Sequence, residues 1–331
     1  MVKADGIISG TEVVKKIFSK IDPTITCSFS VTDGTFVKKG TVIGTAFGSA
    51  RSLLLSERLV LNVAQRMSGV ASATHRMAES LKRSGSTRIL DTRKTAPGLR
   101  ALDKLAVVHG GGGNHRVGLY DMVLIKDNHI TASGGVKPAI LNTQRMFALR
   151  GARSSAWQSE ELKAQLAAGG VWVGEEVFRA SEHAADDPIR GETIVVEIEV
   201  GSIAELKDVL SLGGVDRIML DNMVKVRREK LSEEELSQLS KREEDWERVG
   251  AEWVSVSQGM RVCVDVTMVE QCMELVNKVR AESGWALEME VSGNVVEDTV
   301  GAIGKTGVNY VSSGALTHSV IALDISMKIK L

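Results

Sequence analysis

The stretch TIVVEIEVGSIAELKDVLSLGGVDRIMLDN (193–222) decides the fold of this chain. It begins with an apolar, β-branched run that ends in charged and small polar residues. A segment of helix length (202–214) follows, and the strand-like run RIMLDN (217–222) closes the stretch. A strand, a helix and another strand in succession form a βα unit of a parallel sheet. We therefore expect an α/β fold.

The same strand pattern occurs six times along the chain, and helix-length segments such as 266–283 separate most of the copies. A doubly wound sheet concentrates its polar strand ends at one switch point. An α/β barrel instead carries its active site on the C-terminal ends of many strands. Six polar strand ends favour the barrel, so we predict an incomplete TIM-like α/β barrel over 87–319. The copies are RILDTRK (88–94), DMVLIKDNH (121–129), TIVVEIEVGS (193–202), RIMLDN (217–222), WALEMEVSGN (285–294) and VNYVSSGAL (308–316).

Residues 1–86 have a different pattern and predict a smaller N-terminal α/β sandwich domain. Short strand-like runs between turns fill 2–47, and the spacing of apolar residues predicts one helix over Thr11–Lys20 with Thr11 as its N-cap. The tail 320–331 alternates apolar and polar residues, which is typical of a strand. We expect the tail to complete the sheet of this first domain.

Residues 51–83 have the apolar spacing of a helix. We expect Met67–Gly69 to divide this stretch into two helices, because glycine weakens a helix. Arg58 lies beside the apolar stripe, where a solvated helix charge is its plainest interpretation. The stripe consists of Leu55, Leu59, Val63, Met67 and Val70.

Two segments of the predicted barrel have the character of insertions. Residues 148–192 are rich in glycine and alanine and show little strand pattern. Residues 224–258 contain the charged run EKLSEEELSQLSKREEDWER (229–248). A solvated helix on the outside of the barrel is the favoured interpretation of that run, with partner binding as the alternative.

Composition excludes several classes of protein. The 331 residues hold 41 Lys+Arg against 42 Asp+Glu, and no run approaches the about 18 apolar residues of a membrane helix. Aromatic residues make up 4%, which argues against stacking platforms for single-stranded nucleic acid. The cysteines have no CxxC spacing, so neither a zinc site nor a disulfide framework is expected. They are Cys27, Cys263 and Cys272.

Positive charge is concentrated in RILDTRKTAPGLRALDKLAVVHGGGGNHRVGLYDMVLIKDNHI (88–130). This stretch holds seven Lys or Arg residues and three of the six histidines of a nearly neutral chain. Nucleic acid more often requires a basic face over a whole domain. A local cationic stretch therefore predicts a small polyanionic substrate.

Several strand ends carry residues suited to such a substrate. Lys126 follows the apolar run MVLI and is a candidate for binding phosphate or pyrophosphate. Glu199 and Asp221 end the next two strands, where carboxylates can hold ribose hydroxyls, a Mg²⁺ ion, or both; neutralising nearby cations is the alternative. The small residues of Ser292–Asn294 and Ser313–Ala315 follow the last two strands, where barrels often bind a phosphate.

Two loops of the cationic stretch carry weaker signals. In Thr92–Thr95 two adjacent cations can face a carboxylate or phosphate if the backbone turns. The glycine run 110–113 precedes His115 and Arg116, a pair of donors on a loop that a ligand can approach closely. Glycine-rich loops are common, so neither signal decides a function by itself.

Together these strings resemble the quinolinate phosphoribosyltransferase family, also called nicotinate-nucleotide pyrophosphorylase (carboxylating), in its bacterial and plant-type form. The resemblance rests on the stretch 88–130, on SERLVLNVAQRMSGVAS (56–72), and on the strings VEIEV, IMLDN, VSGN and SSGALTHSV. It covers nearly the full length outside the two insertions. It implies phosphoribosyl transfer from phosphoribosyl pyrophosphate to quinolinate, with decarboxylation, in NAD biosynthesis.

The resemblance also implies roles for single residues. Lys126, Glu199 and Asp221 would be catalytic, with Glu199 and Asp221 contacting the ribose and helping to place Mg²⁺ beside the pyrophosphate. Arg58 would reach the site of a second subunit, so a homodimer at least is expected. The substrate-binding set would be Arg58, Arg93, Lys94, Thr95, His115, Arg116, Lys126, Glu199, Asp221, Ser292, Gly293, Asn294, Gly314, Ala315 and Leu316.

The chain departs from the family in its longer insertions and in a start close to the first strand, which predicts a truncated N-terminus. We expect a cytoplasmic protein, or a plastid (chloroplast) protein if the source is a plant or alga. The alternatives are a phosphoribosyltransferase of the same fold acting on a monocarboxylate such as nicotinate and a non-catalytic ligand-binding relative. A Schiff-base lyase would need a lysine in an apolar strand interior, whereas Lys126 has polar neighbours. The clustered arginines favour a dicarboxylate, and the charged strand ends argue against a non-catalytic relative.

Overall fold

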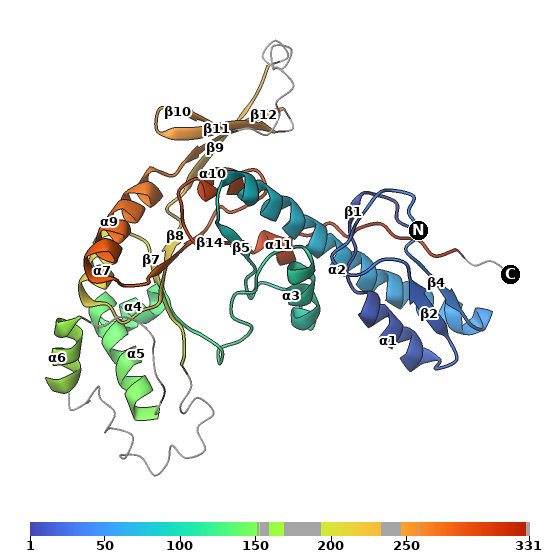
Figure 1. Cartoon of the computed structure of the whole chain (residues 1–331), viewed down its shortest axis with the longest axis horizontal. Coiled ribbons are helices and arrows are strands. Elements are labelled where there is room, and N and C mark those ends of the chain that lie inside the picture. The colour runs from blue at the N-terminus through green and yellow to red at the C-terminus, as the bar shows by residue number, and fades with distance from the viewer. Residues whose placement is uncertain (151, 153–158, 169–192, 233–245, 258, 329–331) are drawn as a thin grey trace. The chain divides into compact units, whose positions relative to one another are not determined.

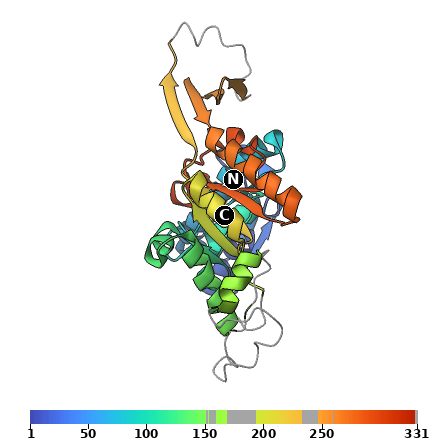
Figure 2. The ribbon, with the colours of Figure 1, turned by 90° about the vertical axis from the view of Figure 1, so that its left-hand side faces the viewer.

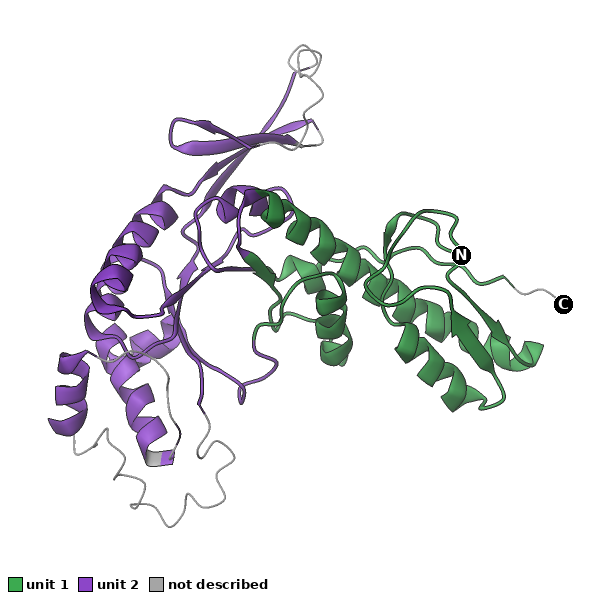
Figure 3. Cartoon of the chain, viewed as in Figure 1, with its two compact units in different colours: residues 1–83, 88–115, 312–331 green, residues 84–87, 116–311 purple. Residues whose placement is uncertain are grey.

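The computed structural model describes all residues except 151, 153–158, 169–192, 233–245, 258 and 329–331. The chain divides into two compact units (Figure 3). Unit 1 consists of residues 1–83, 88–115 and 312–331, and unit 2 of residues 84–87 and 116–311. No helix among the described residues has the length and hydropathy needed to cross a membrane.

The N-terminal part of unit 1 packs small antiparallel strand pairs with helices (Figure 1). One isolated antiparallel bridge joins Val2 to Ile325, so the tail returns to the first residues of the chain. The two apolar clusters of this part centre on Ile8 and on Phe18. The elements are β1 (Gly6–Ile7), α1 (Thr11–Ile21), β2 (Thr26–Phe29), β3 (Phe36–Val37) and β4 (Gly44–Phe47), with β1 paired to β3 and β2 to β4.

The start of α1 differs from the prediction. The helix lies where the apolar spacing placed it, but its N-cap is Gly10 at φ 99° and not Thr11. The backbone N–H of Thr11 donates to Oδ1 of Asp33 over 3.0 Å. A carboxylate from a distant turn therefore accepts a hydrogen bond at the start of the helix, where the sequence predicted that the Thr11 hydroxyl would cap the helix.

One continuous helix, α2 (Ala50–Ser84), replaces the two helices expected here. The prediction of a break at Met67–Gly69 was wrong, because a single interior glycine costs about 1 kcal/mol without ending a helix. The structure gives this glycine a packing role: a Cβ on Gly69 would lie 2.5 Å from the carbonyl oxygen of Ile321. The expected apolar stripe is also divided, since Leu55 and Leu59 are exposed whereas Met67 and Val70 are buried.

The rest of unit 1 follows the cationic stretch and the last strand. It comprises β5 (Arg88–Leu90), α3 (Arg100–His109) and the short α11 (Ala315–His318). The backbone N–H of Ser313 donates to the carbonyl of Leu90 over 3.0 Å. The last residue of β5 and the residues before α11 are therefore joined within one unit.

Unit 2 is built on a parallel sheet in the order β14-β13-β8-β7-β6. All six predicted strands, including β5, are present, and the α/β class with a parallel sheet is confirmed. Closure of the sheet into a barrel stays a prediction. The strands of unit 2 are β6 (Val123–Ile125), β7 (Val196–Val200), β8 (Arg217–Asp221), β13 (Glu288–Ser292) and β14 (Tyr310–Ser312), the last of which ends in unit 1.

Helices connect these strands, and an antiparallel sheet extends beyond them (Figure 2, yellow and orange strands). That second sheet has the order β10-β11-β12-β9, and three of its four strands lie within the predicted insertion 224–258. The helix predicted for the charged run falls mainly on 233–245, outside the described residues. The elements are α4 (Asp127–Ser133), α5 (Val136–Arg150), α6 (Glu160–Ala168), α7 (Ile203–Leu212), β9 (Lys225–Lys230), β10 (Glu247–Val249), β11 (Glu252–Ser257), β12 (Met260–Asp265), α9 (Thr267–Ser283) and α10 (Val300–Gly304).

Candidate active site

In unit 2 an ion pair joins the C-terminal ends of two neighbouring parallel strands. Lys126 follows β6, and its Nζ lies 2.7 Å from Oε2 of Glu199 on β7. The Lys126 side chain is 43% exposed and that of Glu199 is 11% exposed. Two predicted catalytic residues are thus brought together, with the cation accessible to a ligand.

The ends of β8 and β13 are joined by a second pair of turns. Asn222 follows Asp221 at φ 55°, and its amide donates to Oδ2 of Asp221 over 2.6 Å. Its backbone N–H donates to the carbonyl of Ser292 over 3.0 Å. Gly293 is required here, because a Cβ at this residue would lie 2.3 Å from Oδ1 of Asn222. Asp221 and the turn Ser292–Asn294, both predicted from sequence, therefore form one local structure.

Unit 1 holds the remaining predicted loops. Arg93 and Lys94 are exposed, and Arg100 fixes their loop by donating from Nε to Oγ1 of Thr95 over 2.7 Å. A Cβ on Gly314 would lie 3.1 Å from Cδ of Lys94 and 2.8 Å from the ring of His318. The side chain of Lys94 therefore lies beside the small-residue turn that precedes α11. Ala315 is half-buried there, and Leu316 is buried.

His115 and Arg116 are both buried, although the sequence indicated an open glycine-rich loop. The backbone N–H of His115 donates to Oδ1 of Asp91 over 2.9 Å, so the loop is anchored from beneath. Arg58 is exposed on α2, as expected for a residue that reaches outward. The predicted residues thus fall into two sets, one in each unit, and each set is described by itself.

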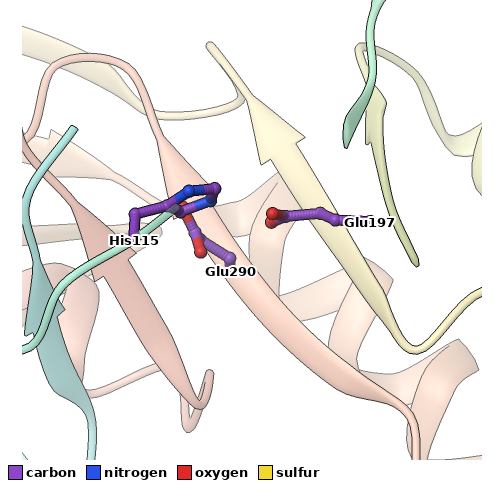
Figure 4. A group of neighbouring side chains, drawn as sticks. All are labelled: His115, Glu197 and Glu290. Carbon is purple, nitrogen blue, oxygen red and sulfur yellow. The ribbon is translucent and has the colours of Figure 1, made fainter. Parts of the chain in front are cut away.

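A group of buried acidic and basic side chains in unit 2 was not predicted from the sequence. Glu197 and Glu290 are fully buried, and one carboxylate oxygen of each lies within 4.8 Å of the other (Figure 4). Arg217 donates from Nη1 to Oε2 of Glu290 over 3.3 Å. Burial raises the pKa of Glu197 to about 7, and the positive charges of Arg217, Arg116 and Lys126 act in the opposite direction. Alternation in VEIEV was the signal for Glu197, since Glu197 and Glu199 share a face of β7.

His318 was also missed. Its ring lies beside Gly314 and the aliphatic chain of Lys94, and its Nδ1 lies 2.6 Å from Oγ of Ser319. The string SSGALTHSV carried this residue, but an isolated histidine one turn after a glycine has no distinctive spacing. Its imidazole adds a further potential hydrogen-bonding group to the predicted site residues of unit 1.

An α/β protein whose strand ends carry a lysine–carboxylate pair, an aspartate and small-residue turns is of a class suited to phosphorylated or carboxylated substrates. Family models narrow this class. The N-terminal domain of quinolinate phosphoribosyl transferase matches residues 1–68, and the C-terminal domain matches residues 70–154 and 166–328. The chain belongs to the quinolinate phosphoribosyltransferase family, so the resemblance inferred from the sequence is confirmed.

Curated relatives agree over the full chain. "Quinolinate phosphoribosyltransferase [decarboxylating] 1b" of Nicotiana tabacum is 38% identical, over 99% of this chain and 72% of its own length. The chloroplastic "nicotinate-nucleotide pyrophosphorylase [carboxylating]" of rice, Oryza sativa subsp. japonica, is 37% identical, over 99% of this chain and 68% of its own length. A probable enzyme of the same name from Bacillus subtilis is 30% identical, over 100% and 82%.

Solved structures agree with the fold. NadC from Streptococcus pyogenes is 29% identical and aligns with a TM-score of 0.66 over 99% of this chain and 84% of its own. The nicotinate-nucleotide pyrophosphorylase from Francisella tularensis is 26% identical, with a TM-score of 0.66 over 98% and 83%. The members are named as phosphoribosyltransferases or nicotinate-nucleotide pyrophosphorylases, so the family is one of pentosyltransferases, and its reaction belongs to NAD biosynthesis.

Proposed function

We propose that this chain transfers the phosphoribosyl group of phosphoribosyl pyrophosphate to the ring nitrogen of quinolinate. The products are nicotinate mononucleotide, pyrophosphate and CO₂. The structural observation that most supports the proposal is the Lys126–Glu199 ion pair at the ends of adjacent strands. Both charges suit phosphoribosyl transfer, since a cation can stabilise the leaving pyrophosphate and a carboxylate can stabilise the positive charge that develops on the ribose.

The family resemblance assigns residues to the binding of each of the two anionic substrates. Arg93, His115 and Arg116 serve the carboxylates of quinolinate together with Lys126. Lys94 and Thr95 serve phosphoribosyl pyrophosphate. The turns Ser292–Asn294 and Gly314–Leu316 serve the ribose 5-phosphate, because small residues leave backbone N–H groups open to an anion.

The chemistry requires positioning and electrostatics and no nucleophilic side chain. The bond from the ribose carbon to pyrophosphate breaks, and its electron pair leaves with the pyrophosphate. The developing oxocarbenium ion is stabilised by the carboxylates of Glu199 and Asp221, and the lone pair of the pyridine nitrogen forms the new bond. When the adjacent carboxylate departs as CO₂, the electron pair of the broken bond stays on the ring carbon. The positive charge of the neighbouring ring nitrogen stabilises this carbanion, and that carbon then takes a proton from solvent.

Mg²⁺ fits the carboxylates of Glu199 and Asp221 better than the buried group around Glu197. Mg²⁺ prefers oxygen ligands and keeps several waters. The oxygens of Glu199 and Asp221 belong to half-buried side chains at strand ends, whereas Glu197 is fully buried and its raised pKa favours the neutral acid. Mg²⁺ held with the pyrophosphate would supply charge neutralisation for the leaving group.

A homodimer is the proposed assembly, with Arg58 entering the site of the partner subunit. Arg58 lies between exposed apolar side chains on α2, since Leu55 is 72% exposed and Leu59 is 50% exposed. An apolar patch around a cation is suited to a protein interface.

A cytoplasmic or plastid location is the proposed compartment. The rice relative is named chloroplastic, and two tobacco relatives are named mitochondrial.

One assay tests the proposed function. Purified protein is incubated with phosphoribosyl pyrophosphate, Mg²⁺ and either quinolinate or nicotinate, and nicotinate mononucleotide and CO₂ are followed together. The expected result is equal amounts of both products from quinolinate and none from nicotinate. Turnover of nicotinate without CO₂ would instead establish the monocarboxylate enzyme. No turnover of either substrate by a folded dimer would favour a non-catalytic relative.

A further inference from the structure

Two adjacent residues of α3 carry opposite charges, and both are buried. Asp103 has no exposed surface, and Lys104 is 3% exposed. Successive residues of a helix point in different directions, so these two charges contact different neighbours. Each buried charge needs its own set of partners, because an unpaired one is very costly.

Lys104 holds the loop that carries His115. Its Nζ donates to Oδ1 of Asp91 over 2.6 Å and to the carbonyl of His115 over 2.8 Å. The same Oδ1 of Asp91 accepts the backbone N–H of His115 over 2.9 Å. Both backbone polar groups of His115 are therefore bound by one buried ion pair.

Asn114 completes this arrangement. With its amide group oriented to satisfy its neighbours, its nitrogen lies 2.7 Å from Oδ2 of Asp91 and 3.0 Å from the carbonyl of Lys104. Asp91 directly follows β5, so the loop is tied to the end of a strand as well as to α3. The segment Asn114–His115, which leads into Arg116, has its backbone fixed from the protein interior.

Asp103 holds a different loop. Its carboxylate accepts two hydrogen bonds from Arg66, 2.9 Å from Nε and 2.7 Å from Nη2, and one from the backbone N–H of Ala96 over 3.1 Å. Arg66 also donates to the carbonyl of Thr317, whose hydroxyl donates to the carbonyl of Lys94 over 2.7 Å. This network fixes Lys94 and the start of α11, the region proposed for phosphoribosyl pyrophosphate.

We propose that the Asp91–Lys104 ion pair positions the loop that presents His115 and Arg116 to the carboxylates of quinolinate. The inference rests on the proposed function. Both side chains are closed off from solvent, so they are positioning residues that act through the loop. A small displacement of a substrate-binding side chain removes much of its contribution to substrate binding and catalysis. The ion pair prevents such a displacement, because it holds both backbone polar groups of His115.

The test compares two variants of the dimeric enzyme. The Asp91→Asn/Lys104→Met double variant removes both charges and keeps similar volumes, which avoids leaving one buried charge unpaired. We expect the KM for quinolinate to rise about tenfold, the loss of roughly one charge-assisted hydrogen bond. The KM for phosphoribosyl pyrophosphate should stay within about threefold of the wild-type value.

Asp103→Asn is the matched control, because Asp103 is an adjacent, equally buried charge that holds the other loop. It should raise the KM for phosphoribosyl pyrophosphate at least as much as that for quinolinate. Asp91→Glu, which keeps both charges of the pair and lengthens one side chain, should shift the quinolinate KM in the same direction if the double variant folds poorly. Calorimetric titration of each variant with quinolinate should show the same weakening as the KM.

Equal rises in both KM values for the double variant would overturn the inference, since a merely structural role affects both substrates alike. An unchanged quinolinate KM would overturn it as well. These results are distinguishable from failure of the proposed function, because that failure would appear as a wild-type protein that makes no nicotinate mononucleotide.

Discussion

Two lysine–carboxylate pairs of this molecule have nearly the same length and very different surroundings. Lys104 lies 2.6 Å from Asp91, with 4% and 0% of the two side chains exposed. Lys126 lies 2.7 Å from Glu199, with 43% and 11% exposed. The first pair also binds the backbone of a loop, whereas the second stands at the ends of β6 and β7.

The difference teaches that distance does not decide what an ion pair does. Charges removed from water interact strongly but cost much desolvation, so a buried pair serves stability and geometry only when both partners are present. A half-exposed pair contributes little to stability, since water screens it. We expect the half-exposed lysine to exchange its contact with Glu199 for a contact with an anionic substrate.

Breaking the buried pair should have the largest effect on stability. Lys104→Met leaves the carboxylate of Asp91 buried without its cation, and we expect the free energy of unfolding to fall by about 3–5 kcal/mol. Adding Asp91→Asn should recover most of that loss, because both charges are then absent. Denaturant unfolding of the two variants measures the difference. A double variant no more stable than the single one would show that the charges are not coupled.

The buried carboxyl of Glu197 should make stability depend on pH. Burial raises its pKa from 4.5 to about 7, so the folded chain holds a proton that the unfolded chain has already released in this range. Stability from this group therefore falls as the pH rises from about 4.5 to about 7, by on the order of 3 kcal/mol at about 1.4 kcal/mol per pKa unit.

Glu197→Gln is the matched variant for this pH dependence, since glutamine stays neutral throughout. The free energy of unfolding should fall more between pH 5 and pH 7.5 for the wild type than for the variant. Parallel curves for the two proteins would contradict a raised pKa and indicate that Glu197 is ionised in the folded chain.

An ion pair on the surface should contribute least to the free energy of unfolding. Arg228 on β9 donates two hydrogen bonds to Asp298, 3.0 Å and 2.8 Å long, but the side chains are 42% and 30% exposed. We expect Asp298→Ala to change the free energy of unfolding by no more than about 1 kcal/mol. Thermal unfolding of this variant and of Lys104→Met compares the two losses of stability directly. An equal loss in the two variants would show that burial does not decide how much an ion pair contributes to stability.

The parts of the fold and site that follow local sequence patterns were predictable. Each apolar run that leads into a polar end became a strand, so Lys126, Glu199 and Asp221 could be placed at strand ends from their neighbours in the chain. The ends of α7 and α9 were also close to prediction, because apolar spacing and flanking glycines mark them.

The parts that depend on distant partners could not be predicted. Gly69 was interpreted as a helix break, since the sequence does not show that the backbone of Ile321 passes beside it. Asp103 and Lys104 have the pattern of solvated helix charges, and their burial depends on Arg66 and Asp91 from other elements. Closure of the sheet and the roles of single site residues likewise depend on arrangements beyond local sequence.

The central claim is that the half-exposed pair acts on substrate while the buried pair supports the structure. The most direct test is to measure kcat and the free energy of unfolding of Lys126→Ala together. We predict a kcat about 100- to 1000-fold below that of the wild type, the usual cost of losing one electrostatic donor to a developing charge. The free energy of unfolding should stay within about 1 kcal/mol of the wild-type value. A kcat close to that of the wild type, or a loss of activity that merely follows a loss of stability, would contradict the account.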